Sequence, residues 1–321
     1  MYKRQGFETL PEVDEETPSY VEFITGPGGV IDTWLRRGAA GFRLDVADEL
    51  PDEFIEKVRA AVKRVSPEKF LLGEVWEDAT TKFGFNKRRT YLLGKGLDSV
   101  MNYPFKNAVL DFVKGKPAEQ AMTEILTICE HYPAPAMDTA LNFLSTHDTE
   151  RALTVIADEP ANGRGRAWQS GRCVTGDAYE EGLLRLRMAY AIIYTLPGVP
   201  CLYYGDEIAM QGYRDPFNRA FFRWDAHEQR LRPVLAQLAQ LRHTCEAFRT
   251  GQLRVLRAED GILHYQRVGK VETAEIIVNR TEHIIVETLA SGKSTEVNPM
   301  GFTIVVEEVG HNPDHSYYDY V

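Results

Sequence analysis

The sequence of 321 residues lacks the features that mark several classes of protein. Its four cysteines, Cys129, Cys173, Cys201 and Cys245, stand far apart, and the chain has no CxxC pair and no Cys/His cluster. This spacing suggests neither a zinc site nor a disulfide framework. Isolated cysteines are typical of reduced, buried side chains in a cytoplasmic protein. We therefore expect a cytoplasmic location and no metal site.

Long apolar runs and basic clusters are absent as well. No stretch is long enough to span a membrane, and the N-terminus leads into polar, acidic sequence instead of a signal peptide. The net charge is −10, and no Lys/Arg cluster is interleaved with aromatic residues. We therefore expect neither a membrane nor a nucleic acid as a partner. The acidic balance also disfavours an anionic substrate, whereas a neutral one such as a sugar fits better.

The chain also lacks a glycine-rich phosphate loop, which weakens the case for an open nucleotide-binding sheet. A split helical region over 18–37, interrupted by Gly26-Pro27-Gly28-Gly29, comes first. Strand-like runs then alternate with helical patterns, which predicts a parallel β/α architecture. The expected strands are 41–46, 70–75, 97–102, 140–145 and 200–204, and the expected helical regions are 52–65, 78–95, 105–131, 178–196 and 229–249. Polar residues at several strand ends favour a (β/α)8 barrel over a doubly wound sheet.

The pattern changes near residue 252. Short β-rich segments follow, separated by turn residues, and they predict a small antiparallel β domain, expected to be a β-sandwich. These segments are 253–256, 262–267, 274–278, 283–286 and 302–306. We expect three parts: part of a barrel over 1–250, the β domain over 251–309 and a flexible tail over 310–321.

The stretch Gly41-Phe42-Arg43-Leu44-Asp45 reads as a short buried strand that ends in charge. Arg43 and Asp45 are two positions apart, so a strand places both side chains on one face. Burying these charges is costly unless they are paired. They could form a structural ion pair, with Asp48 near the positive end of the following helix. Alternatively, Asp45 is a catalytic carboxylate that the guanidinium keeps ionised.

Two more strand ends carry carboxylates, Glu74 and the pair His147-Asp148. Taken singly, Glu74 could be a surface carboxylate and His147-Asp148 a loop turn or a helix cap. In a barrel, however, the strand ends converge on one site. Crowded carboxylates raise the pKa of at least one of them, as a general acid requires. Two carboxylates on either side of a glycosidic bond are the usual requirement for its hydrolysis.

Three segments resemble signature regions of the α-amylase family, in the family's order. They are Gly41-Phe42-Arg43-Leu44-Asp45, Gly73-Glu74-Val75-Trp76 and Phe143-Leu144-Ser145-Thr146-His147-Asp148. Two further segments, Met101-Asn102-Tyr103-Pro104-Phe105 and the stretch 198–208, resemble the branch of neopullulanases, cyclomaltodextrinases and maltogenic amylases.

The resemblance implies a role for each matching residue. Asp45 would be the nucleophile, Glu74 the general acid/base and Asp148 the carboxylate that stabilises the oxocarbenium-like transition state. Arg43 would orient and ionise Asp45, and His147 would bind hydroxyls of the sugar that is cleaved.

Three other residues would extend the sugar site. Asp215 and Arg219 match a pair that binds the next sugar on the non-reducing side, although they could also form an ordinary ion pair in a surface loop. Trp76 would be a stacking surface near the acceptor side, or else a core residue.

The implied reaction is retaining hydrolysis of α-glucosidic bonds in maltooligosaccharides, cyclodextrins or pullulan. It requires Asp45 and Glu74 with carboxyl groups about 5 Å apart, and no cofactor takes part. Some relatives bind structural calcium, which this chain does not support. Two alternatives remain open: a non-catalytic relative that binds carbohydrate or protein, and an α-glucosidase or transglycosylase of the same family.

The chain also departs from the family. The first signature region is absent, so the resemblance implies a partial barrel of about strands 4 to 8 from a longer enzyme, weak or inactive alone. The open sheet edges would favour self-association or a missing N-terminal half of the barrel as partner. Asp48 and Glu77 stand where this branch more often has Asn and His.

Overall fold

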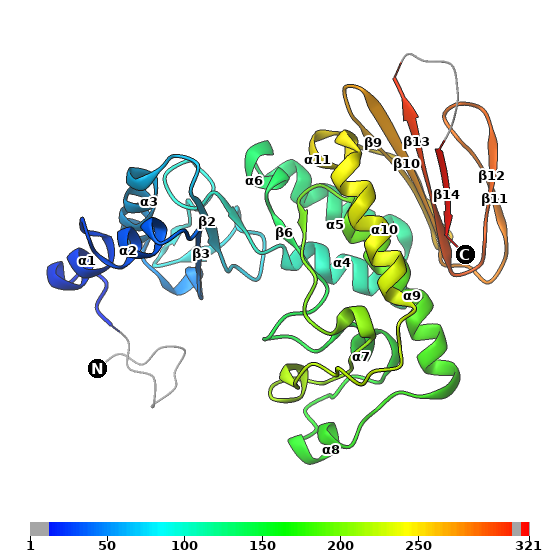
Figure 1. Cartoon of the computed structure of the whole chain (residues 1–321), viewed down its shortest axis with the longest axis horizontal. Coiled ribbons are helices and arrows are strands. Elements are labelled where there is room, and N and C mark those ends of the chain that lie inside the picture. The colour runs from blue at the N-terminus through cyan, green and yellow to red at the C-terminus, as the bar shows by residue number, and fades with distance from the viewer. Residues whose placement is uncertain (1–12, 310–315, 321) are drawn as a thin grey trace. The chain divides into compact units, whose positions relative to one another are not determined.

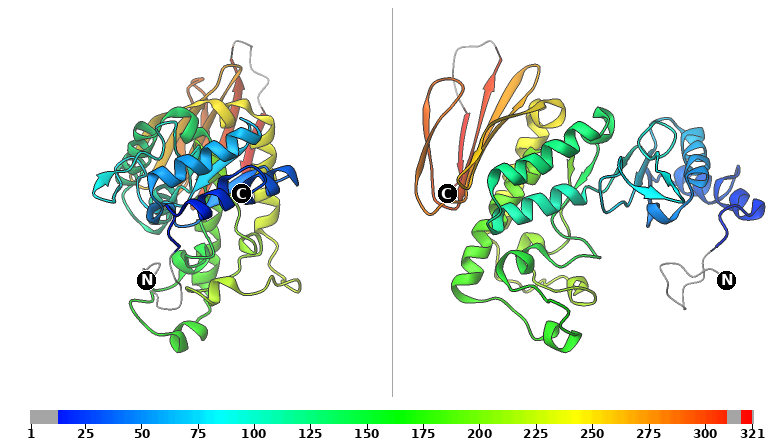
Figure 2. Two further views of the ribbon diagram at one scale, coloured as in Figure 1. Left: turned by 90° about the vertical axis from the view of Figure 1, so that its left-hand side faces the viewer. Right: turned by 180° about the vertical axis from the view of Figure 1, so that it is seen from behind.

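The computed structural model of the chain describes residues 13–309 and the backbone of 316–320. The chain forms two units (Figures 1 and 2). The first contains the described residues up to 101 together with 131–139, and the second contains 102–130 and the described residues from 140 onward.

The first unit is built on a three-stranded parallel sheet in the order β1-β2-β5, with helices packed beside it (Figure 1). In chain order its elements are α1 (Pro18–Thr25), α2 (Val30–Arg36), β1 (Gly41–Leu44), the 3-10 helix η2 (Ala47–Glu49), α3 (Asp52–Val65), β2 (Phe70–Gly73), β3 (Phe83–Gly84), β4 (Lys87–Arg88), β5 (Ser99–Val100) and α6 (Ala134–Asp138). The predicted break between α1 and α2, the first three strands and the helix 52–65 are therefore confirmed.

The helix predicted within 78–95 is wrong. This segment contains the short hairpin β3–β4, whose turn residues Phe85 and Asn86 have φ values of 52° and 58°. Such left-handed conformations end any helix. Phe83 and Phe85 in the hairpin are exposed, whereas Tyr91 and Leu92 after it are buried.

The prediction that β1 is a buried strand is also wrong. All four of its residues are half-buried, and Asp45 just beyond it is more than half exposed. β1 pairs with β2 in parallel register, from Gly41 opposite Phe70 to Leu44 opposite Gly73. Among the residues that the structure describes, no strand covers the other edge of β1, which explains this exposure.

Asp98 ties helix α3 to the sheet. Arg59 and Lys63 of α3 donate to its two carboxylate oxygens at 2.7 and 2.8 Å, and the backbone N–H of Leu71 in β2 donates at 2.8 Å. Burial raises the pKa of Asp98, but the hydrogen bonds from Lys63, Arg59 and Leu71 outweigh it, so the pKa lies below its ordinary value.

Because the folded pKa of Asp98 is depressed, its contribution is present above the pKa of the unfolded chain, about 4, and is lost as pH falls through the folded value. We expect Asp98→Asn to lower stability at pH 7 and to weaken the loss of stability below pH 4. Urea unfolding between pH 3 and 7 measures both. Glu68→Gln, an exposed change in the same unit, should change neither. Parallel pH curves for Asp98→Asn and the wild type would contradict this role.

The second unit contains a helical layer and an antiparallel sheet. Its helices are α4 (Tyr103–Lys114), α5 (Ala118–His131), α7 (Ala152–Ala157), α8 (Arg166–Ser170), α9 (Gly176–Thr195), α10 (Leu231–Thr244) and α11 (Glu246–Thr250), with 3-10 helices η3 (Asp206–Ile208) and η4 (Phe217–Arg219). Helix α9 packs against α4, α7 and α10. Its residues 188–193 are almost wholly buried, so it forms the core of this layer.

Two short parallel strands, β6 (Leu141–Asn142) and β7 (Val199–Pro200), lie within the helical layer. The Asn142 amide donates to the Pro197 carbonyl at 2.7 Å and accepts from Asn102 at 2.9 Å. Gly198 lies so close to this pair that a Cβ atom would come within 2.8 Å of the Asn142 amide nitrogen, and its φ of 104° also requires glycine.

The antiparallel sheet has the order β14-β13-β10-β9-β8, and a separate hairpin pairs β11 with β12. The strands are β8 (Gln252–Glu259), β9 (Ile262–Val268), β10 (Glu272–Asn279), β11 (Ile285–Thr288), β12 (Ser294–Val297), β13 (Gly301–Glu308) and β14 (Ser316–Tyr320). The hairpin packs on the sheet through Ile277, Leu289, Val297 and Val305. The polar strand β12 was not predicted. β14 lies within 310–321, where we expected a flexible tail; the rest of that segment is outside the described residues.

Arg267 of β9 joins this sheet to the helical layer. Its wholly buried guanidinium donates to the Thr195 carbonyl at the end of α9 and to the Gly251 carbonyl after α11, at 2.7 to 3.0 Å. Beside it, the hydroxyls of Tyr265 and Thr195 are 2.6 Å apart. The sheet and helices are thus parts of one unit.

Replacing Arg267 by Ala should destabilise the second unit by more than about 2 kcal/mol, because it leaves buried carbonyls without donors and opens a cavity. Thermal and urea unfolding measure the change. Arg254→Ala, an exposed arginine on the neighbouring β8, should stay within about 0.5 kcal/mol of the wild type. Equal stabilities of the two variants would show that Arg267 does not stabilise the junction between the sheet and the helical layer.

The parallel strands β1, β2 and β5 form one sheet and β6 and β7 another, and the described part of the chain shows no closed barrel. In that same part, no helix is long and apolar enough to cross a membrane. All four cysteines are free. The expectation of buried cysteines holds for Cys245 alone: Cys129 and Cys201 are half-buried, and Cys173, in the loop between α8 and α9, is exposed.

Candidate active site

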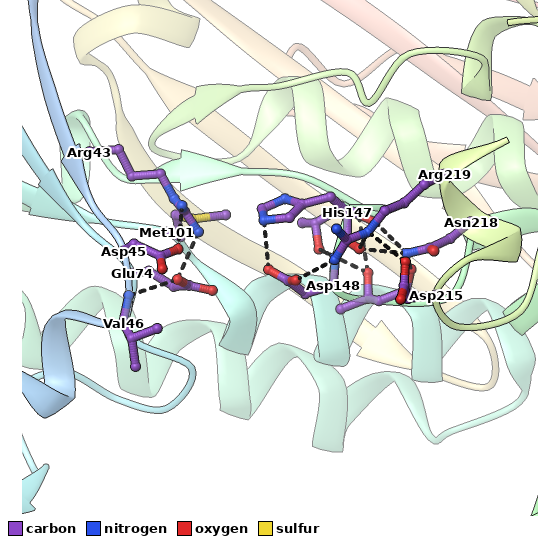
Figure 3. A network of polar contacts seen from close by, with 12 residues as sticks. Arg43, Asp45, Val46, Glu74, Met101, His147, Asp148, Asp215, Asn218 and Arg219 are labelled. Atoms are coloured by element: carbon purple, nitrogen blue, oxygen red, sulfur yellow. Dashed lines mark hydrogen bonds and ion pairs between the residues drawn. The ribbon is translucent and has the colours of Figure 1, made fainter. Parts of the chain in front are cut away.

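Arg43 connects the two predicted catalytic carboxylates of the first unit (Figure 3). One guanidinium nitrogen lies 3.0 Å from Asp45 Oδ1, and the other lies 2.7 Å from Glu74 Oε2. Its Nε also contacts the sulfur of Met101 at 3.2 Å. The same-face placement predicted for Arg43 and Asp45 is therefore confirmed, and the guanidinium bridges the ends of β1 and β2.

Glu74 is nearly buried and contacts Arg43, Val46 and Trp76. Only 4% of its side chain is exposed, which excludes the interpretation as a surface carboxylate. Its Oε2 accepts the backbone N–H of Val46 at 2.9 Å, and its Oε1 accepts the indole N–H of Trp76 at 3.0 Å. Both oxygens are thus oriented by donors from neighbouring segments, and Asp45, 58% exposed, is open to solvent.

Arg89 holds the segment after Asp45, residues 48–52, in place. This fully buried arginine contacts Asp52 at 2.7 Å and donates to the carbonyls of Asp48 at 2.8 Å and Leu50 at 2.5 Å. Its guanidinium also stacks on Tyr91. Sequence reasoning missed Arg89, because nothing in its local pattern shows that it folds back onto the loop after β1.

The two residues that depart from the family pattern, Asp48 and Glu77, share one partner. Lys82 lies 3.1 Å from Asp48 and 2.7 Å from Glu77. Trp76 beside them is 46% exposed, so it is not a core residue, and its role as a stacking surface stays a prediction.

The second unit carries the other predicted site residues as a cluster of its own (Figure 3). His147 Nε2 lies 2.9 Å from Asp148 Oδ2, and Arg219 Nη2 lies 3.2 Å from Asp148 Oδ1. Arg219 also pairs with Asp215 at 3.1 Å and donates to the His147 carbonyl at 2.8 Å. The predicted pair of Asp215 and Arg219 is thus more than a surface ion pair, since it orients the loop with Asp148.

Asn218 holds this loop in place, although sequence reasoning did not single it out. It is wholly buried, and its amide N–H groups face the carbonyls of Thr146, His147 and Thr149, at 3.3, 2.8 and 2.8 Å. A buried amide with three carbonyl partners fixes the backbone on both sides of Asp148. The sequence offered one indication of this role, the position of Asn218 between Asp215 and Arg219.

Asn218→Asp should destabilise the second unit by at least about 1–3 kcal/mol, because a carboxylate cannot donate to the three carbonyls and is repelled by them. We expect weaker maltooligosaccharide binding as well, because the Asp148 loop loses its support. Thermal unfolding and calorimetric titration measure the two effects. Gln237→Glu adds the same charge on the exposed face of α10 and should affect neither. Wild-type stability and binding in Asn218→Asp would contradict the role of Asn218 in supporting the Asp148 loop.

Two further polar residues, Asn102 after β5 and Asp206 in η3, make contacts that support the fold. Asn102 caps α4 by accepting the Phe105 N–H at 3.3 Å. Asp206 is buried, accepts from Tyr190 at 2.6 Å and pairs with the wholly buried Arg151 at 3.1 Å. Burial raises the pKa of Asp206 despite these partners. No group of metal-ligating side chains occurs among the described residues.

Comparison with known proteins identifies the family. Residues 1–247 match the family model of the α-amylase catalytic domain. The chain therefore belongs to the α-amylase family, which consists of glycoside hydrolases and their relatives.

Its relatives point to one branch of the family. The chain is 31% identical to a cyclomaltodextrinase of Geobacillus thermopakistaniensis, over 85% of this chain and 42% of that protein. It is 30% identical to neopullulanase 2 of Thermoactinomyces vulgaris, over 89% of this chain and 44% of that protein. The structure of a Nostoc punctiforme debranching enzyme superposes with a TM-score of 0.78 at 25% identity, over 94% of this chain and 65% of that one. The chain thus spans less than half the length of these two curated relatives.

Proposed function

We propose that the chain carries the catalytic residues of a retaining α-glucan hydrolase acting on maltooligosaccharides, cyclodextrins or pullulan, as part of a longer enzyme. The observation that carries this proposal is the bridge that Arg43 makes between Asp45 and Glu74. It places two carboxylates from neighbouring strand ends around one cation, in a chain whose family hydrolyses glycosidic bonds.

In this proposal the two carboxylates have different tasks. Asp45, the more exposed, attacks the anomeric carbon and forms a glycosyl-enzyme, and Arg43 orients it through their contact at 3.0 Å. Glu74 donates its proton to the departing sugar oxygen and then takes a proton from the water that releases the glycosyl group. Trp76, which donates to Glu74, offers a ring face to the departing sugar.

The residues of the second cluster bind sugar in this proposal. Asp148 stabilises the positive charge that develops on the sugar ring, and His147 bonds its hydroxyls. Asp215 and Arg219 bind the next ring. These four residues come from the second unit alone. This favours a second candidate function, a non-catalytic relative that binds carbohydrate through this cluster.

Three further features of the proposal concern the architecture of the chain. We propose that the parallel strands are part of a (β/α)8 barrel and that the sheet and hairpin after residue 251 form a β-sandwich domain. Within the described residues no strand pairs with the outer edge of β1, and a further strand would pair there, from another copy or from another segment. Self-association and a cytoplasmic location stay predictions.

The test is turnover of maltotriose and a cyclodextrin by the chain, measured by released reducing sugar. Glu74→Gln should lower the rate by about 10²–10⁴-fold, and Asp45→Asn should do at least as much, while both still bind maltooligosaccharide. Glu77→Gln removes an exposed carboxylate three residues away and should leave the rate unchanged.

Equal rates for Glu74→Gln and the wild type would remove the catalytic assignment. If the wild-type chain binds maltotetraose but releases no sugar, the carbohydrate-binding function is supported for the chain itself. Absence of binding and turnover together would overturn both candidates.

A further inference from the structure

Val46, the residue directly after Asp45, has a backbone conformation that its own side chain disfavours. Its φ and ψ angles are 46° and 51°, in the left-handed region. A branched Cβ crowds the backbone there, so a valine in this region carries conformational strain. Among the described residues, Val46 is the only β-branched one with a positive φ. The other such residues apart from glycine are Phe85, Asn86, Asn162, Ala209, Asp260 and Met300.

The left-handed turn directs two consecutive backbone N–H groups at Glu74 (Figure 3). The N–H of Val46 donates to Glu74 Oε2 at 2.9 Å, and that of Ala47 donates to the Glu74 carbonyl at 3.1 Å. Before the turn, the Glu74 N–H donates to the Leu44 carbonyl at 3.0 Å. Asp45 lies between these contacts, so the chain is attached to Glu74 on both sides of it. The conformation of residue 46 therefore sets the position of Asp45 relative to Glu74.

Two cations hold the 3-10 helix η2, which follows the turn. Arg89 donates to the carbonyls of Asp48 and Leu50 at 2.8 and 2.5 Å. Lys82 Nζ lies 3.1 Å from Asp48 Oδ2, and only 21% and 22% of these two side chains are exposed. Burial lowers the pKa of Lys82, but its contacts with Glu77 and Asp48 outweigh this effect, so the pKa lies above its ordinary value. The ammonium is therefore charged where it meets Asp48.

The contact with Asp48 matters more for the turn than the second contact of Lys82. Glu77 is 61% exposed, so solvent screens its pair with Lys82, whereas the pair with Asp48 is shielded at both ends. If residue 46 relaxed to a negative φ, its N–H would turn away from Glu74 and η2 would have to move. Backbone strain persists only where the surroundings fix it, and the contacts of η2 supply that support.

We propose that Val46 is a positioning residue for Asp45, and that Lys82 and Arg89 keep its strained turn closed. The turn acts through the backbone and keeps Asp45 beside Glu74. Its role in catalysis rests on the proposed function, because it requires Asp45 to be the nucleophile. The support of the turn by η2 does not depend on that function, so the two are tested separately.

Hydrogen exchange of the full chain, followed by mass spectrometry on a peptide that covers residues 44–50, measures how often the turn opens. Lys82→Met should speed this exchange about tenfold, because Asp48 loses a charged contact. Val46→Asn relieves the strain, since asparagine tolerates the left-handed region better than valine does. In that background, Lys82→Met should speed the exchange less than about twofold. In Val46→Thr, which is polar but still β-branched, the tenfold effect should remain.

Lys116→Met is the matched control, because Lys116 is 23% exposed and also pairs with two carboxylates, Asp111 and Glu124, in the second unit. It should leave the exchange of residues 44–50 unchanged. An equal effect of Lys82→Met in the wild type and in Val46→Asn would overturn the inference, since no strain would then be released. Faster exchange in Val46→Asn than in the wild type would overturn it as well.

Turnover of maltotriose tests the role in catalysis. Lys82→Met should lower kcat about tenfold and leave KM unchanged, because Asp45 leaves the geometry of attack. Adding Val46→Asn should restore kcat, and a loss that it does not restore would overturn the positioning role. If the wild-type chain has no turnover, the proposed function fails, and the exchange rates still decide whether Lys82 holds the turn. If turnover is present but exchange shows no coupling, the inference fails and the proposed function stands.

Discussion

The pairing of Arg43 with two carboxylates is the constraint on which the candidate active site depends. One guanidinium contacts Asp45 at the end of β1 and Glu74 at the end of β2. Burying a polar group such as the nearly buried carboxyl of Glu74 is costly unless it has polar partners. The backbone N–H of Val46 and the indole N–H of Trp76 also donate hydrogen bonds to Glu74. The register of β1 against β2 therefore matters for chemistry as well as for packing, because it brings the three charges together.

Arginine has a similar organising role in the second unit. Arg219 reaches Asp148, Asp215 and the backbone of His147, while Asn218 holds the carbonyls on both sides of Asp148. These contacts come from the short helix η4 and order a loop that has little regular structure of its own. Arg267 acts at a larger scale by joining the antiparallel sheet to the end of α9. In each case one planar, multidentate donor fixes several backbone carbonyls or carboxylates at once.

Polar groups of the second unit fall into two kinds, which differ in burial. Asp206 and Arg151 are buried together and support the fold, while Asp148 and Asp215 stay accessible. Accessible, partly paired polar groups are able to exchange partners with sugar hydroxyls, whereas the buried pair cannot do so without a large cost. Burial thus explains why Asp206 supports the structure.

The sequence by itself determined most of the alternation of strands and helices, the β-rich region after residue 252 and the family, and it singled out Asp45, Glu74 and Asp148 as candidate site residues. Local periodicity and short motifs carry this information. Only the tertiary structure decided which residues support them, because Arg89, Asn218 and Arg267 act on partners distant in the chain. It also decided that 78–95 contains a hairpin and that β1 is half-buried. The reason is physical: burial and hydrogen-bond partners depend on neighbouring strands and loops, which a local pattern does not record.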